Sequence, residues 1–519
     1  MNYLDVFKTI LTKYKIEIFA ITLFLLVLPL SLKVTFYQND DWVYYQTVER
    51  FQSGNFTLHP YSGPTLYLQA FLGMMFANIF GISRLPVLTL IMACISVYIL
   101  IRILKDFYEI SGNTSFLIGL VYFLNPIGVY ELWGFMTNHY FMVFMLSSVY
   151  FFLKFDRSLS KKSFGLFILF AFLGLLIRQV ALTLPLAAAG YLFLKRNIKW
   201  STVSGISFLA LYIFYSKILP LTPRIKEVPL QLENFTKNDY TFAILYGSLL
   251  VSVAYLLPLA LNYIDLKKVT KNKKAIITFL FIFIASFLFL NKNFKPDEVS
   301  WGEFPYFENV FERTGLYPRG ISGTKYHFRG NFDLWKYWDI GAKIVSAAVV
   351  AFLIRYNIFK NSFFVIFWTI YLLMAITTKT FYDRYVHVAI PMLILMFVEH
   401  TKRIPPFLTY LLALFVFFLT YFAYFVSMDF ITVNKYVWDR SVQLVQEDSI
   451  EPSQIRGTNA WRLTYPNAQR EYDYFFSYDS PATNQELSEE NYLIETKAIE
   501  YPLNIFIEPK VYLYKRKNV

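Results

Sequence analysis

The feature that most constrains this chain is a series of long apolar runs between residues 16 and 426. A helix that spans a membrane needs about 20 mostly apolar residues, and about thirteen runs approach that length. Of all residues 56% are hydrophobic and 16% are charged, whereas soluble domains have roughly 45 to 50% and about 25%. The sequence therefore predicts an all-α polytopic membrane protein. The predicted spans are 16–36, 85–104, 116–131, 138–155, 163–178, 179–194, 200–219, 241–263, 275–290, 339–355, 362–378, 384–399 and 406–426.

Other protein classes are excluded by the residue content. The single cysteine, Cys94, rules out an intramolecular disulfide framework and a multi-cysteine metal cluster. The formal charge of +13 comes from basic residues scattered between apolar runs, whereas binding to nucleic acid needs them on one soluble face. The first run follows Lys8, Lys13 and Lys15 and lacks a small-residue cleavage site after it. We therefore expect an uncleaved first membrane helix with its N-terminus in the cytoplasm.

The distribution of Lys and Arg predicts the orientation of the spans, because cytoplasmic loops carry an excess of these residues. When the spans alternate from a cytoplasmic N-terminus, every short basic loop falls on the cytoplasmic side. These loops contain residues 102–105, 154–162, 195–199, 267–274, 355–360 and 402–403. The longer polar segments then fall on the extracytoplasmic side, at 37–64, 220–240, 291–338, 379–383 and 427–519.

Two domains are expected on this basis. Residues 1–426 form the polytopic membrane domain, within which the apolar run 65–80 is expected to be a half-inserted or surface-lying helix because a polar loop directly precedes it. Residues 427–519 are polar and end in the apolar runs 503–507 and 511–514, which suit short strands. We expect this tail to be a small extracytoplasmic α+β domain.

An acidic pair, Asp40 and Asp41, follows the first predicted span directly. A carboxylate at the edge of the bilayer is partly desolvated and suits a general base for a hydroxyl or amine. The competing interpretation is a helix N-cap, in which an aspartate accepts hydrogen bonds from backbone N–H groups.

The acidic pair and several other stretches together resemble a known family. Each motif is weak alone, but their order and spacing over 16–426 are similar to the GT-C superfamily of polytopic glycosyltransferases. The nearest branch includes the protein O-mannosyltransferases and the bacterial aminoarabinose transferase of lipid A. The motifs are Asp40-Asp41-Trp42, Pro64-Thr65-Leu66-Tyr67, Ser83-Arg84-Leu85-Pro86, Phe135-Met136-Thr137-Asn138, Arg178-Gln179 and Tyr382-Asp383-Arg384-Tyr385.

The resemblance implies transfer of a sugar from a polyprenyl-phosphate donor to a glycan, lipid or protein acceptor on the extracytoplasmic face of the bacterial inner membrane. In the family pattern the first acid of the pair is the functional one, so Asp40 is the expected base and Asp41 its neighbour. The family commonly has an acidic residue where this chain has Asn138, which puts a second catalytic carboxylate there in doubt. An Asn that caps the fourth span is an alternative.

Three arginines are expected at the external ends of spans, where a guanidinium fork could hold the carrier phosphate. They are Arg84, Arg178 and Arg384, and snorkelling to the interface is the alternative for each. The remaining residues expected to line the site are Tyr44, Glu131, Asn138, His139, Gln179, Asp383 and Tyr385.

Glu131 has a more ordinary interpretation as a solvated loop carboxylate. Some members of the family use a divalent cation, for which His59, Glu131 and His139 would be the ligands, although the five histidines lack zinc-protease spacing. No other cofactor is expected.

Two other functions stay open. A secondary transporter or lipid flippase would place charged residues along a path through the membrane, but here the polar residues gather at one face and the external loops are long. A GT-C scaffold without activity is the other alternative, which the departure at Asn138 keeps open.

Overall fold

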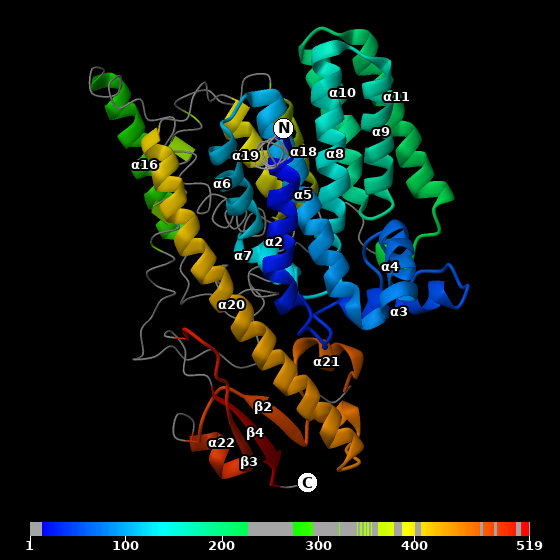
Figure 1. Cartoon of the computed structure of the whole chain (residues 1–519), viewed down its shortest axis with the longest axis vertical. Coiled ribbons are helices and arrows are strands. Elements are labelled where there is room, and N and C mark those ends of the chain that lie inside the picture. The colour runs from blue at the N-terminus through cyan, green and yellow to red at the C-terminus, as the bar shows by residue number, and fades with distance from the viewer. Residues whose placement is uncertain are drawn as a thin grey trace, which may run out of the picture.

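The computed structural model describes residues 13–226, 273–293, 321, part of 340–354, 362–377, 387–399, 406–467, 471–481, 485–504 and 510–517. The described chain is mostly helical, with one small sheet. The helices form a bundle in the upper part of Figure 1, and the sheet lies at the lower end. The predicted span 241–263 and most of 339–355 lie outside the described residues.

Most of the predicted spans correspond to helices of the bundle. Among the described residues, three segments are long and apolar enough to cross a membrane, namely Ile82–Tyr108, Ile198–Ile218 and Pro406–Gln446. The other apolar helices are shorter, so thirteen spans stay a prediction. The bundle helices are α2 (Lys15–Ser31), α5 (Leu85–Tyr108), α6 (Gly112–Phe123), α8 (Thr137–Ser158), α9 (Lys161–Leu175), α10 (Thr183–Leu194), α11 (Ile198–Ile213), α16 (Lys273–Asn293), α18 (Phe363–Thr377), α19 (Ile390–Glu399) and α20 (Pro406–Gln446).

The predicted span 116–131 is interrupted. Helix α6 ends at Phe123, and the short helix α7 (Pro126–Glu131) follows it. Asn125 precedes a proline, and the proline ring disfavours helical backbone in the residue before it. The break gives the chain a change of direction, and a turn then leads from Glu131 to the start of α8 at Thr137.

The first external loop contains α3 (Asp41–Gln52), and α4 (Tyr67–Phe80) follows it. Both lie at the lower end of the bundle in Figure 1. The helix predicted at 65–80 is confirmed, while its depth in the membrane stays a prediction. One face of α4 exposes Phe71, Met75 and Ile79, and the opposite face buries Gly73, as expected for an amphipathic helix at an apolar surface.

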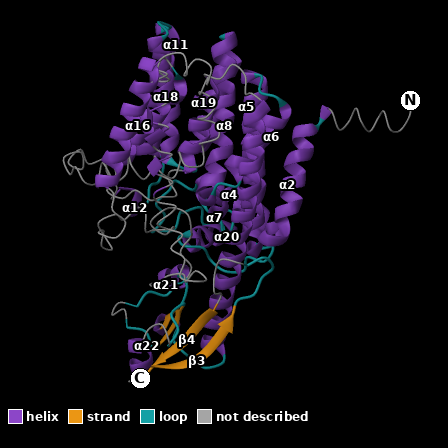
Figure 2. Ribbon diagram, turned by 90° about the vertical axis from the view of Figure 1, so that its left-hand side faces the viewer, coloured by secondary structure: helices purple, strands orange, loops and turns teal. Residues whose placement is uncertain are grey.

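Helix α20 is 41 residues long, so the domain boundary predicted after residue 426 falls inside it. Its final third carries a sheet with strand order β1-β2-β4-β3, in which β1 and β2 are parallel and the other pairs antiparallel. Val511 and Leu513 of the sheet share a core with Val433 and Val437 of α20. The strands are β1 (Ile455–Arg456), β2 (Tyr474–Ser477), β3 (Asn491–Ala498) and β4 (Lys510–Arg516), with α21 (Asn459–Thr464) and α22 (Gln485–Glu490) beside them (Figure 2).

The α+β character of the tail is confirmed, and the strand predicted at 511–514 lies within β4. The strand predicted at 503–507 is wrong at its first position, because Leu503 lies in a turn with φ 63°. Asn504 is also not in a strand, and the rest of that run, 505–507, lies outside the described residues.

The two ends of α8 differ in their surroundings. Near the C-terminal end of α8, the Arg157 guanidinium donates to the carbonyl of Asp106 at 3.0 Å, and Asp156 pairs with Lys195 at 2.9 Å. Three of the predicted cytoplasmic loops therefore meet there. Its other end adjoins the first external loop, as described below. Since α8 has 22 residues, these ends are about 33 Å apart at 1.5 Å per residue.

Candidate functional site

The second acid of the pair, Asp41, is fully buried and holds two backbone segments together. Its Oδ1 accepts a hydrogen bond from the backbone N–H of Gln38 at 2.7 Å, and its Oδ2 accepts one from the backbone N–H of Phe135 at 3.1 Å. Burial raises the pKa of Asp41 well above that of an ordinary carboxyl group, while these two N–H donors act in the opposite direction. Asp41 therefore fastens the first external loop to the segment before α8.

Asp40 lies in a different environment, although it is the adjacent residue. It is half-buried and occupies the N-cap position of α3. Among the described residues its side chain accepts no cap hydrogen bond from the helix, so Asp40 occupies the cap position without the side-chain bond that the capping interpretation expects. Asn39, which precedes it, has φ 48°, and its side-chain oxygen accepts from Asn459 of α21 at 2.7 Å. The backbone on both sides of Asp40 is thus anchored by its neighbours.

Glycine at position 134 is required for this arrangement. A Cβ atom at Gly134 would lie 2.4 Å from Oε1 of Gln38 and 2.6 Å from Oδ2 of Asp41. The backbone before α8 can therefore approach the first external loop only because this residue has no side chain.

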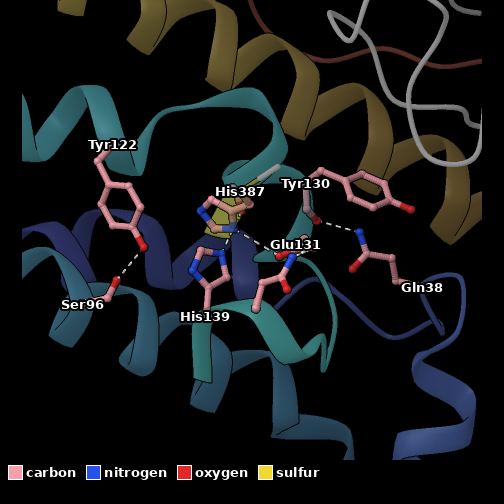
Figure 3. A network of polar contacts seen from close by, with 9 residues as sticks. Gln38, Ser96, Tyr122, Tyr130, Glu131, His139 and His387 are labelled. Atoms are coloured by element: carbon pink, nitrogen blue, oxygen red, sulfur yellow. Dashed lines mark hydrogen bonds and ion pairs between the residues drawn. The ribbon is translucent and has the colours of Figure 1, made fainter. Parts of the chain in front are cut away.

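A buried polar network extends from this contact toward the start of α8 (Figure 3). The Gln38 amide donates to the carbonyl of Tyr130 at 2.6 Å, and the Asn138 amide donates to Oε1 of Glu131 at 2.5 Å. Glu131 is only 1% exposed, so the expectation of a solvated loop carboxylate is wrong. The N-cap of α8 is Met136, so Asn138 is not a helix cap but the partner of a buried carboxylate.

Glu131 also faces two histidines. Its Oε2 lies 3.3 Å from Nδ1 of His387, and the ring centroids of His139 and His387 are 5.0 Å apart. These three buried residues are a group among the described residues that could hold a metal ion. The predicted ligand His59 does not belong to it, because His59 packs against Trp42 and Tyr61 in the first external loop, with ring centroids 5.3 and 5.7 Å away.

The predicted arginines have separate surroundings. Arg84 is exposed and donates to the carbonyl of Leu32 at 3.3 Å, just beyond the end of α2. Arg178 is half-buried and lies within electrostatic range of His387. Arg384 lies outside the described residues, as do Asp383 and Tyr385, so a three-arginine clamp stays a prediction.

The motif around Pro64 contacts the one that contains Arg178. The Thr65 hydroxyl donates to the carbonyl of Leu175 at 2.5 Å, and the Leu66 N–H donates to Ile177 at 3.1 Å. Gln179 reaches the carbonyl of Gly63 at 3.5 Å.

The motif before α8 also contacts its neighbours. The Gln69 amide of α4 donates to the carbonyl of Phe135 at 2.9 Å, and the ring of Tyr45 packs against that of Phe135 with centroids 5.9 Å apart. The predicted site residue Tyr44 is buried in the first turn of α3. Stretches far apart in the sequence thus gather around the start of α8.

Sequence reasoning missed His387 and Gln38. His387 follows the Tyr382–Tyr385 stretch by two residues, but its partners Glu131 and His139 are more than 240 positions away in the sequence, and zinc-protease spacing covers only local ligands. Gln38 lies next to Asn39 and the acidic pair. Its side chain binds the backbone carbonyl of Tyr130, and a contact to a backbone group cannot be recognised from a pattern of side chains.

The arrangement offers a half-buried carboxylate at the edge of the bundle beside a buried polar network. Such a carboxylate can accept a proton from a hydroxyl or amine.

No protein family model, curated protein or solved structure matches this chain.

Proposed function

We propose that this chain is a membrane glycosyltransferase that moves a sugar from a polyprenyl-phosphate donor to an acceptor on the extracytoplasmic side, with Asp40 as the general base. The observation that carries the proposal is the division of roles within the acidic pair. Asp41 is fully buried and binds two backbone N–H groups, while Asp40 is half-buried at the N-cap position of α3, and its side chain makes no cap hydrogen bond.

The chemistry requires one carboxylate that can reach an acceptor. Asp40 would take the proton from the acceptor hydroxyl or amine as that atom attacks the anomeric carbon, and the carrier phosphate would leave. A base of this kind works only if its backbone is fixed, and the hydrogen bonds of Asn39 and Asp41 on either side provide that.

The position of Glu131 supports the proposal despite the departure at Asn138. The resemblance implies an acidic residue at 138, and the Glu131 carboxylate lies 2.5 Å from the Asn138 amide. A carboxyl group is thus present at this place, supplied from α7. An aspartate at 138 beside Glu131 would instead set two buried carboxylates against each other.

Arg178 is the candidate among the described arginines for the carrier phosphate. It immediately follows the segment that binds the loop before α4, and it is half-buried. A guanidinium in such a place keeps its charge and can bind two phosphate oxygens.

The contact between α21 and the first external loop supports placing the tail on the same side as Asp40. Asn459 bonds Asn39, and Lys435 near the end of α20 bonds the Thr35 hydroxyl at 3.0 Å. The bacterial inner membrane and the extracytoplasmic side are part of the proposal, carried by the Lys and Arg distribution.

The test uses the purified full chain in nanodiscs with polyprenyl-phosphate donors that carry different labelled sugars. Membranes of the source cell supply the acceptors. The proposal expects label to pass to an acceptor from at least one donor, with release of polyprenyl phosphate. If the folded protein transfers no label from any donor of this class, the proposal is wrong.

A transporter or lipid flippase is a second candidate, favoured by one observation. Glu131, His139 and His387 are ionisable and buried in the bundle, and such groups in membrane proteins often mark a substrate path. Proteoliposomes distinguish the two functions, because a transporter moves a labelled lipid or sugar phosphate across the bilayer without chemical change. Flux without transfer of label would favour this second candidate.

A further inference from the structure

The group formed by Glu131, His139 and His387 brings together two consecutive helices, α7 and α8, and a third segment that is distant in sequence. Glu131 ends α7, His139 lies in the first turn of α8, and His387 begins the short helical turn before α19. Their exposed fractions are 1%, 2% and 0%, and each offers a ligand atom within 4.8 Å of the others. Figure 3 shows the two imidazole rings and the carboxylate facing one another.

The hydrogen bonds decide which ring nitrogens hold lone pairs. His139 Nε2 lies 2.9 Å from the carbonyl oxygen of Gly128. Because a carbonyl can only accept, Nε2 carries the proton, and Nδ1 keeps a lone pair. Among the described residues, neither Nδ1 of His139 nor Nε2 of His387 has a hydrogen-bond partner. Buried imidazole nitrogens without partners are uncommon in folded proteins and call for an explanation.

The spacing of the closest pair fits a metal ion. His387 Nδ1 and Glu131 Oε2 are 3.3 Å apart, and two ligands at about 2.0 to 2.1 Å from a tetrahedral zinc ion are themselves about 3.3 to 3.4 Å apart. A metal ion would take the place of the proton that these two atoms share.

The surrounding bonds have the form expected around metal ligands, which are commonly oriented by a second hydrogen bond. The Gly128 carbonyl fixes the ring of His139, and the Asn138 amide binds Oε1 of Glu131 and leaves Oε2 directed at the histidines. The positive charge of Arg178 lies within electrostatic range of His387, and by repulsion it would weaken the binding of a cation there. As a metal ligand, the Glu131 carboxyl group would be deprotonated and would supply one negative charge against it.

We propose that Glu131, His139 and His387 bind one divalent transition-metal ion of the zinc class. The ion joins the starts of α8 and α19 and thereby holds Asn138 and the turn before α8 against the acidic pair. Two imidazoles and one carboxylate are a donor set that zinc commonly uses. The assignment goes beyond glycosyl transfer and does not depend on it.

The test is metal binding by the full chain, purified without a histidine tag. The protein is stripped with a chelator, equilibrated with Zn²⁺ alone and desalted, and its zinc content is measured by mass spectrometry. The proposal expects about one equivalent in the native chain and a large loss in His387→Gln and Glu131→Gln. The matched control His59→Gln, a histidine outside the group, should keep its zinc. Asn138→Ala should weaken binding by about 10- to 100-fold.

Cobalt substitution of the native chain keeps the test independent of how the variants fold. Tetrahedral Co²⁺ with nitrogen and oxygen ligands gives intense visible absorption bands, which zinc should abolish by displacement. Absence of both bound zinc and these bands in the folded native chain would overturn the proposal. Equal loss of zinc in His59→Gln and His387→Gln would also overturn it.

Discussion

Gly134→Ala tests the contact between the first external loop and the start of α8. The new Cβ atom would lie 2.4 Å from Oε1 of Gln38 and 2.6 Å from Oδ2 of Asp41, whereas ordinary contacts begin at 3.4 Å. The two side chains must therefore retreat by up to about 1 Å, or the backbone must shift. The hydrogen bond from the Phe135 N–H to Asp41 is 3.1 Å long, so a retreat of that size would break it.

The expected loss in the free energy of unfolding depends on which of two ways the structure responds to the new Cβ atom. If the side chains stay in place, an overpacked site costs about 1 to 3 kcal/mol. If Asp41 moves, the buried N–H of Phe135 loses its partner, at about 1 to 3 kcal/mol. These are alternative responses to one clash, so we expect a destabilisation of about 2 kcal/mol rather than their sum.

The chain contains its own probe for this measurement. Its one cysteine, Cys94, is buried, so a thiol-reactive dye reports unfolding in detergent as the temperature rises. Gly63→Ala is the matched control, because a Cβ at this other loop glycine meets nothing within 4 Å. We expect Gly134→Ala to lower Tm by a few degrees relative to Gly63→Ala. Equal Tm values for the two variants would refute the close packing at Gly134.

Three further predictions concern the network, the carrier and the topology. Asn138→Asp should destabilise the fold by about 3 to 5 kcal/mol, as an uncompensated buried charge does; low pH should lessen the loss of Tm, because one of two adjacent carboxyls then takes up a proton. Arg178→Lys keeps the charge but loses the guanidinium fork, so binding to immobilised polyprenyl phosphate should weaken, while Arg50→Lys in the first external loop should bind as the native chain does. A reporter that is active only in the cytoplasm should be inactive when fused after Val519, and activity there would reverse the side assignment.

Much of the helical architecture could be predicted because apolar runs in a membrane protein leave a strong signal. The positions at which helices begin and end were less predictable. The apolar pattern gives no end point for α20, which continues past residue 426 because it packs against the sheet. The break at Asn125 within a predicted span comes from a local proline effect that a hydrophobicity pattern does not contain.

The candidate site was predictable only in part. The acidic pair could be identified from its position after the first span, but which acid is buried depends on the Phe135 N–H, which is 94 positions away. Glu131 follows an apolar run and resembles a loop residue in sequence. Its burial depends on Asn138 and on His387, which the fold brings from a distant segment.

The central claim, that Asp40 is the base of a glycosyl transfer, is tested most directly by comparing Asp40→Asn with Asp41→Asn in the labelled-donor assay. The same preparations are measured for carrier binding and for Tm with the Cys94 probe. Because a general base contributes about 10²- to 10⁴-fold, Asp40→Asn should lower turnover by that factor while Tm and carrier binding stay unchanged. Asp41→Asn should lower Tm, because its amide nitrogen cannot accept one of the two backbone N–H bonds. Near-native turnover in a folded Asp40→Asn variant would contradict the account.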